Sequence, residues 1–185
     1  MKNFGETLRI GALETDACRN LATQPMAALN ISYAHPELVE LIIKESGRRA
    51  NLVAILCHEI LQILENRRVI EATDIKRALD SREIYTALGG WGNLAGKKSR
   101  LDRIIVYATI EQKQFSATEL WQQLDALNFV YQPEQVNESL ARLELAFILK
   151  REKDQYSYRV PLFYNLLKTQ GTSEMLTREL ELMAR

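Results

Sequence analysis

Two adjacent arginines, Arg48 and Arg49, are the residues whose type and position most clearly suggest a binding function. They follow Ser46-Gly47 and fall in or just before the first turn of an apolar segment spanning residues 49–66. Cations at a helix start oppose the helix dipole, so the pair is better explained if an anion binds there. A guanidinium suits this role because it stays charged and offers a planar fork of donors. The alternative interpretation is a solvated pair that closes a loop.

The other reactive side chains form no catalytic or metal-binding pattern. His58 and Glu59 begin a His-Glu pair, but the zinc protease motif needs a second histidine on the next turn, and the only other one is His35. Cys18 and Cys57 fall on apolar helical faces, which predicts buried free thiols in a reducing cytoplasm. We therefore expect no catalytic residue, metal site or cofactor in this chain.

Composition and charge limit the classes of function. The 185 residues include 24 basic and 24 acidic side chains, so the net charge predicts neither nucleic-acid nor membrane binding. Neither a signal peptide nor an apolar run of spanning length occurs, so we expect a cytoplasmic protein without membrane contact. Residues 8–10 look like a lone strand without a partner, which suggests a fragment of a longer chain.

The elements that would position the arginines form a predicted four-helix domain over residues 1–87. The helix over residues 49–66 is apolar nearly all round, which is typical of the buried centre of a bundle. Pro25 should kink or end the first helix, and Pro36 suits the start of the second. The other predicted elements are helices over residues 14–29, 37–45 and 73–81, a loop over 30–35 and a short extended piece at 69–70.

A glycine-rich segment, residues 88–99, is predicted to be a linker. The predicted elements after it are a helix over residues 100–112, an extended step at 115–116, helices over 116–127 and 133–147, and a hairpin over 148–160. Ser116 and Glu119 form a capping box at the second of these helices. This order is that of a winged helix, over residues 100–170, and a C-terminal helix follows over 171–185. The predicted fold is thus mainly α with one small β-hairpin.

Several segments carry a resemblance to a known family. They are Ile10–Glu14, Ser46–Leu52, Leu56–Leu61 and Val69–Leu79. Together, residues 8–81 resemble the C-terminal lid of an AAA+ or STAND-type ATPase, which is often followed by a winged helix. Bacterial and archaeal members often end that domain with a tyrosine-rich strand and a proline, similar to Tyr156–Leu162. The resemblance covers almost the whole chain.

The resemblance implies that Arg48 or Arg49 is a sensor arginine that reaches the nucleotide phosphates in an assembled ATPase. ATP and magnesium are implied only for a full-length protein with an upstream core domain, because the phosphate-binding loop and acidic motif of the family precede the lid. Residues 90–99 look superficially like a phosphate loop, but Trp91 replaces a required glycine and no strand precedes it. We expect a non-catalytic lid and effector module that couples nucleotide state to a partner protein and does not hydrolyse ATP alone.

The alternative function is a DNA-binding winged-helix regulator. The expected outward face of the helix over residues 133–147 carries Glu134, Gln135, Glu138 and Arg142, which is net acidic. A recognition helix normally presents Lys or Arg to the phosphates, so contact with a protein is favoured. If DNA does bind, the basic candidates are Lys97, Lys98, Arg100, Arg142, Lys150, Arg151 and Lys153.

Overall fold

The computed structural model describes residues 12–89, 91 and 97–183, and it is mainly helical with small β-sheets. Its first elements are α1 (Thr15–Ala28), β1 (Ser32–Tyr33), α2 (Glu37–Glu45), α3 (Ala50–Leu64), β2 (Val69–Ile70), α4 (Ala72–Leu79) and α5 (Arg82–Gly89). The others are α6 (Lys97–Thr109), β3 (Gln114–Ser116), α7 (Ala117–Ala126), α8 (Pro133–Leu145), β4 (Leu149–Glu152), β5 (Gln155–Tyr158), α9 (Pro161–Thr169) and α10 (Thr172–Met183).

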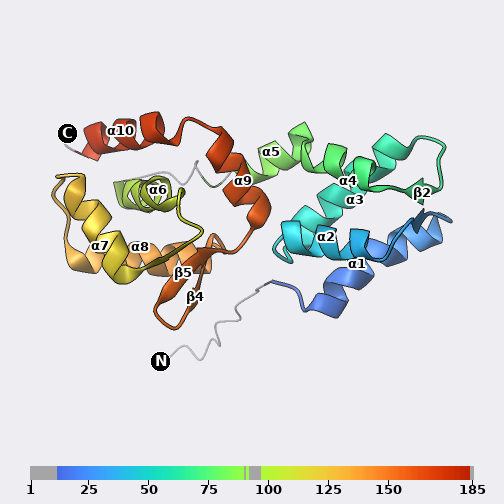
Figure 1. Cartoon of the computed structure of the whole chain (residues 1–185), viewed down its shortest axis with the longest axis horizontal. Helices are drawn as coiled ribbons and strands as arrows, with labels where there is room; N and C mark the ends of the chain where they lie inside the picture. The colour runs from blue at the N-terminus through green and yellow to red at the C-terminus, as the bar shows by residue number, and fades with distance from the viewer. Residues whose placement is uncertain (1–11, 90, 92–96, 184–185) are drawn as a thin grey trace, which may run out of the picture.

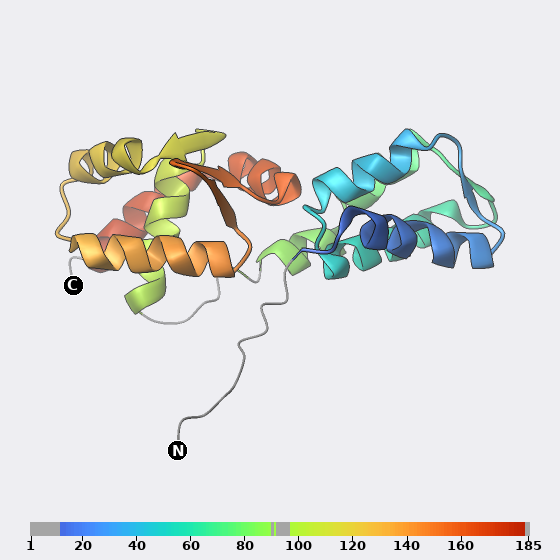
Figure 2. The same ribbon diagram turned by 90° about the horizontal axis from the view of Figure 1, so that it is seen from below.

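These elements lie in two groups, side by side along the long axis of the molecule (Figure 1). We call α1–α5 with β1 and β2 the first group, and α6–α10 with β3–β5 the second group. Helix α9 of the second group lies nearest to the first group and contacts α2. Seen from below, α6 crosses α8 (Figure 2), and it contacts both α7 and α8.

Helix α3 is the buried centre of the first group, which confirms the interpretation of its apolar surface. Leu52, Val53, Leu56 and Ile60 are almost completely buried there. Strands β1 and β2 pair in parallel, with Ser32 opposite Val69. The sequence analysis identified β2 as extended but assigned β1 to a loop, because two residues show no alternation of polar and apolar side chains.

The first group has one helix more than expected, and the structure excludes one of the two alternatives for Pro25. The described residues before position 90 form five helices, and α5 is the one that the four-helix prediction missed. Its buried residues Ile84 and Leu88 lie one turn apart, but the glycines that follow suggested a linker. Pro25 lies inside α1 and does not end it. Pro25 is exposed in the last turn, where its missing N–H removes a single helical hydrogen bond.

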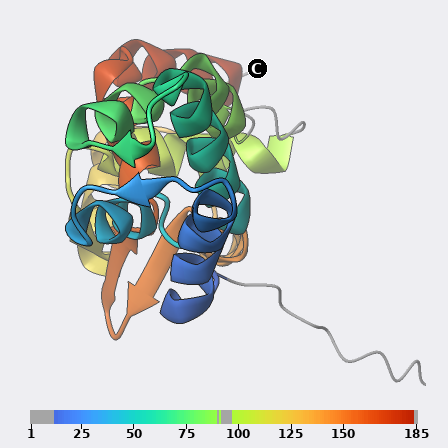
Figure 3. The same cartoon turned by 90° about the vertical axis from the view of Figure 1, so that its right-hand side faces the viewer.

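The second group is built around α6, whose Ile104, Ile105 and Val106 are fully buried. The expected hairpin of β4 and β5 is present, and β3 adds a third antiparallel strand in the order β3-β5-β4. The hairpin projects from the body of the molecule, as the end view shows (Figure 3). The predicted capping box is confirmed: Glu119 N–H donates to Ser116 Oγ at 3.2 Å, and Ser116 N–H donates to Glu119 Oε2 at 2.6 Å.

The segment expected to be a linker is partly helical at both ends. Helix α5 extends through Gly89, and α6 begins at Lys97. Between them, the Trp91 ring packs edge-on against Tyr107 and Phe163, with centroids 5.7 and 5.2 Å away. Residues 90 and 92–96 lie outside the described part, as does the strand expected at residues 8–10. None of the described helices combines the length and apolar character needed to cross a bilayer.

Candidate functional site

The junction between α2 and α3 holds Arg48 and Arg49 in a tight turn. Gly47 and Arg48 both adopt left-handed backbone conformations, with φ of +58° and +61°. The turn is fastened by backbone bonds: Arg48 N–H donates to Ile43 O at 3.3 Å, and Leu13 N–H donates to Arg48 O at 2.9 Å. A non-glycine residue in this conformation costs roughly 1–2 kcal/mol. The fold therefore holds Arg48 in a strained position, which is common at functional sites.

Arg49 precedes α3 as its N-cap residue, and its side chain makes no capping bond. The side chain is partly buried, and burial lowers the pKa of the Arg49 guanidinium. The described residues give it no hydrogen bond and no ion pair. A guanidinium that loses water without gaining an acceptor is unfavourable unless an anion binds to it. The Arg49 guanidinium is therefore partly desolvated and has no acceptor among the described residues.

Arg48 lies in different surroundings from Arg49. Its positive charge acts on the Cys18 thiol of α1, although burial is the larger effect and raises the pKa of Cys18. The side chain is partly exposed. The two arginines therefore have different surroundings: burial acts on the Arg49 guanidinium, and Arg48 lies near Cys18 of α1.

The same turn contacts the second group. A Cβ atom built on Gly47 would lie 3.0 Å from Val160 Cγ2, within the segment that joins β5 to α9. A displacement of the arginine turn would thus be felt directly at the start of α9.

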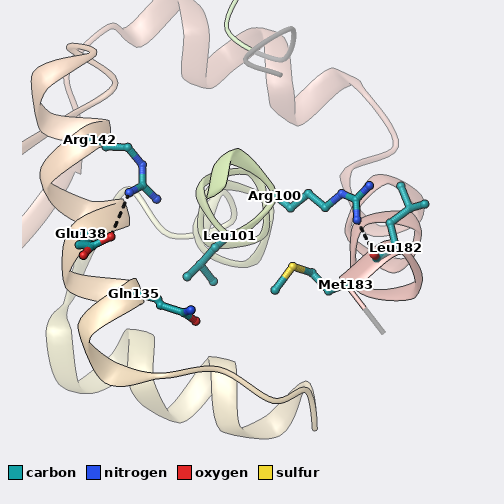
Figure 4. A pocket seen from close by; sticks show the side chains of 7 residues that line it. All are labelled: Arg100, Leu101, Gln135, Glu138, Arg142, Leu182 and Met183. Carbon is teal, nitrogen blue, oxygen red and sulfur yellow. Dashed lines mark hydrogen bonds and ion pairs between the residues drawn. The ribbon is translucent and has the colours of Figure 1, made fainter. Parts of the chain in front are cut away.

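Two of the basic candidates for DNA contact are engaged within the second group (Figure 4). The Arg142 guanidinium binds Asp102 of α6 through two bonds of 2.8 and 3.1 Å and donates to Ser139 Oγ at 2.7 Å. Arg100 donates to the backbone carbonyl of Leu182 in α10. Arg142 also pairs with Glu138 of the expected outward face, at 3.7 Å, but its shorter bonds go to the buried Asp102.

The remaining basic candidates lie on the hairpin and at the start of α6. Lys150 pairs with Glu152 at 2.9 Å, and both side chains are exposed. Arg151 lies over the Tyr156 ring and donates to Lys153 O at 2.9 Å, while Lys153 occupies the turn. Lys97 and Lys98 open α6, and their side chains lie outside the described part of the structure. Of the described candidates, Lys150, Arg151 and Lys153 lie on the hairpin, whereas Arg100 lies on α6 and Arg142 on α8.

The two cysteines are buried free thiols, as expected. Burial raises the pKa of Cys57 to about 11, so the unreactive thiol form predominates. The described residues contain no cluster of three or more His, Cys, Asp or Glu that would hold a metal ion.

Two ion pairs that position elements were missed by the sequence analysis. Arg67, after α3, binds the buried Asp74 of α4 with bonds of 2.6 and 3.1 Å. Arg103 of α6 binds Glu179 of α10 with bonds of 2.8 and 3.0 Å. No local sequence pattern links the two residues of either ion pair. The buried face position of Asp74, an unusual place for a carboxylate, was the one available signal.

Comparison with known proteins gives one informative match. No profile of a known protein family matches the chain, and no curated protein matches it. Among solved structures, the chain is similar to the Walker-type ATPase of Pyrococcus abyssi, with a TM-score of 0.60 and 14% sequence identity. The match covers 85% of this chain and 42% of that one, so the chain spans less than half of that ATPase. At this identity the likeness is one of fold.

Proposed function

We propose that this chain is a non-catalytic, ATPase-associated module of the AAA+ or STAND type. In this proposal the first group is a lid that senses nucleotide, and the second group is a winged-helix effector that contacts a partner protein. The chemistry of ATP and magnesium belongs to a separate core domain. The fold shared with part of a Walker-type ATPase supports this assignment.

The observation that carries the proposal is the environment of Arg49. Its guanidinium is partly desolvated at the start of the central helix and has no acceptor among the described residues. A nucleotide phosphate from an adjoining core domain would supply that acceptor and would also interact favourably with the helix dipole. We therefore assign the sensor role to Arg49 in preference to Arg48.

The order of elements in the second group supports an effector of the winged-helix type. Helices α6, α7 and α8 combine with a three-stranded antiparallel sheet and a projecting hairpin. Glu134 and Glu138 are exposed on α8, whereas Arg142 faces Asp102. An acidic α8 surface disfavours a phosphate backbone and favours a protein partner, so the DNA-binding regulator is the weaker alternative.

A titration of the isolated chain tests whether nucleotide binding and hydrolysis belong to a separate core domain. Calorimetry with ATP and magnesium should show no micromolar binding, and no phosphate should be released, because the chain supplies one arginine and no phosphate loop. Micromolar binding by this chain alone would mean that the nucleotide site lies within it.

Substitution of the arginines tests the sensor role in a protein where this chain follows a phosphate-loop ATPase domain. Arg49→Ala should lower kcat for ATP hydrolysis on the order of 10²-fold, as expected for loss of one charge-stabilising donor. Arg48→Ala should have a smaller effect. Arg77→Ala is the matched control, since that arginine is exposed on α4. Unchanged hydrolysis in both arginine variants would remove the sensor role.

A further inference from the structure

A groove of about 530 Å³ runs along the seam between the two groups, and three lysines line it. Lys44 lies in the last turn of α2 in the first group, whereas Lys113 precedes β3 and Lys150 lies in β4 of the second group. The chain has no net charge, so this gathering of amines is a local feature. Three elements far apart in sequence produce it, which is why no sequence motif marks it. We call it the lysine groove.

The ammonium groups of the lysine groove are available to a ligand. Lys44 and Lys113 form no ion pair with the described residues, and both are exposed. Lys150 is paired with Glu152, but exposed pairs of this kind contribute about 0–1 kcal/mol and are readily exchanged. Glu45 is the one acidic residue among the described residues that line the groove. The lining therefore has a net positive charge.

The remaining lining residues indicate what kind of anion fits. Gln114, Ser157 and Asn165 supply amide and hydroxyl groups, and Pro161 is the one lining residue without a polar side-chain atom. An acidic peptide helix would need a continuous row of apolar side chains to pack against, whereas all but one of the lining side chains carry a polar group. Lys, Ser, Asn, Gln and Tyr are the side chains that contact phosphates and sugars in nucleic-acid complexes.

The aromatic residues distinguish a duplex from a single strand. Proteins that bind single strands stack bases on exposed aromatic faces. Here the hydroxyl of Tyr158 is bonded inside the fold to Val106 O, and the Tyr164 ring is covered by Lys168, whose Nζ lies 5.5 Å from the ring centroid. Both lining tyrosines are thus engaged within the fold, and no other described lining residue is aromatic. The arrangement suits the regular outer backbone of a duplex.

We propose that the lysine groove binds the phosphodiester backbone of a nucleic-acid duplex, without reading its sequence. The bound duplex would contact both groups at once, since Lys44 belongs to one and Lys113 and Lys150 to the other. This site is separate from α8 and does not depend on the nucleotide-sensing role proposed above.

Fluorescence anisotropy with a short labelled duplex tests the proposal on the full chain. With three phosphate contacts, the slope of log K against log salt should be about −2.7, so affinity should fall about 40-fold between 50 and 200 mM salt. The triple variant Lys44→Gln, Lys113→Gln, Lys150→Gln should abolish binding, and each single variant should reduce the slope by about 1. DNA and RNA duplexes of the same sequence are compared, and the duplex that binds with higher affinity identifies the natural ligand.

Two further variants control for charge. Lys76→Gln, Arg77→Gln, Arg82→Gln removes the same charge from exposed positions of α4 and α5 and should leave binding unchanged. Glu45→Gln removes the opposing carboxylate and should raise affinity about threefold, the size of an exposed charge interaction. Circular dichroism verifies that every variant is folded.

Several outcomes would overturn the proposal. They are no duplex binding at 50 mM salt, equal loss in the control triple, tighter binding of the matching single strand, and equally effective displacement by polyglutamate. The duplex-binding assay contains no nucleotide and no partner protein, so a negative result would leave the ATPase-related proposal intact. A negative result with Arg49→Ala would likewise leave the duplex-binding proposal intact.

Discussion

Gly47 lies so close to the backbone of Arg159 that the two groups meet there without an intervening side chain. A Cβ atom at Gly47 would be 2.7 Å from the Arg159 carbonyl oxygen, a distance that real Cβ atoms essentially never show. The φ of +58° at Gly47 adds a second reason for glycine at this position. The arginine turn and the segment that joins β5 to α9 are therefore in backbone contact.

Gly47→Ala should destabilise the protein by roughly 1–3 kcal/mol, because alanine meets both a steric clash and an unfavourable φ. Denaturant unfolding measures this. Gly89→Ala is the matched control: nothing lies within 4 Å of a Cβ there, and Gly89 ends α5. That change should be neutral or stabilising by up to about 1 kcal/mol. Equal stability of the two variants would contradict the close contact.

The Arg67–Asp74 pair should make stability depend on acid. The Arg67 guanidinium holds the pKa of Asp74 below its usual value, so the pair's contribution is complete above the unfolded pKa of about 3.9 and is lost as pH falls through the folded pKa. Asp74→Asn should cost roughly 1–3 kcal/mol at neutral pH and flatten the acid limb of the stability curve. Asp80→Asn, at an exposed position, should leave that limb unchanged.

The Asp102–Arg142 pair should support the packing of α8 on α6. Asp102→Ala should lower the free energy of unfolding by about 1.5–3 kcal/mol, because Arg142 then loses two charged hydrogen bonds. Urea denaturation gives the value. Asp154→Ala, at an exposed position of the hairpin turn, serves as the control. A change in Asp102→Ala no larger than in that control would mean that the pair contributes little.

Neither thiol should react in the folded protein. Burial raises the pKa of both Cys18 and Cys57, which keeps them protonated and shielded at pH 8. Labelling with a thiol reagent followed by mass spectrometry should show no adduct in native buffer and two adducts in denaturant. Rapid native labelling of either cysteine would place it at the surface.

Helix α8 should not bind DNA tightly or sequence-selectively at physiological salt. Glu134 and Glu138 are exposed, and Arg142 is held by Asp102, so a phosphate backbone would meet repulsion. Mobility-shift assays on the unmodified chain and on Glu134→Lys, Glu138→Lys should show a gain only in the double variant. Tight, selective binding by the unmodified chain would restore the regulator hypothesis.

Features encoded by neighbouring residues were predictable, and features made by distant residues were not. The apolar surface of α3, Pro36 before α2 and the Ser116–Glu119 box all follow from local patterns, and the structure confirms them. The partner of Arg142, the pairing of β1 with β2 and the lysine groove depend on elements brought together only by folding. The position of Arg48 and Arg49 at a helix start was evident, whereas the contact of their turn with the segment before α9 was not.

The parallel pairing of β1 and β2 has a consequence for how the chain folds. Helices α2 and α3 both lie between the two strands, so this sheet cannot close until the whole crossover has formed. During synthesis, β1 cannot pair until β2 has left the ribosome, and the apolar face of α1 stays exposed until then. Closure of the first group should thus be a late, cooperative event, and a chain cut anywhere between Tyr33 and Val69 should not complete it.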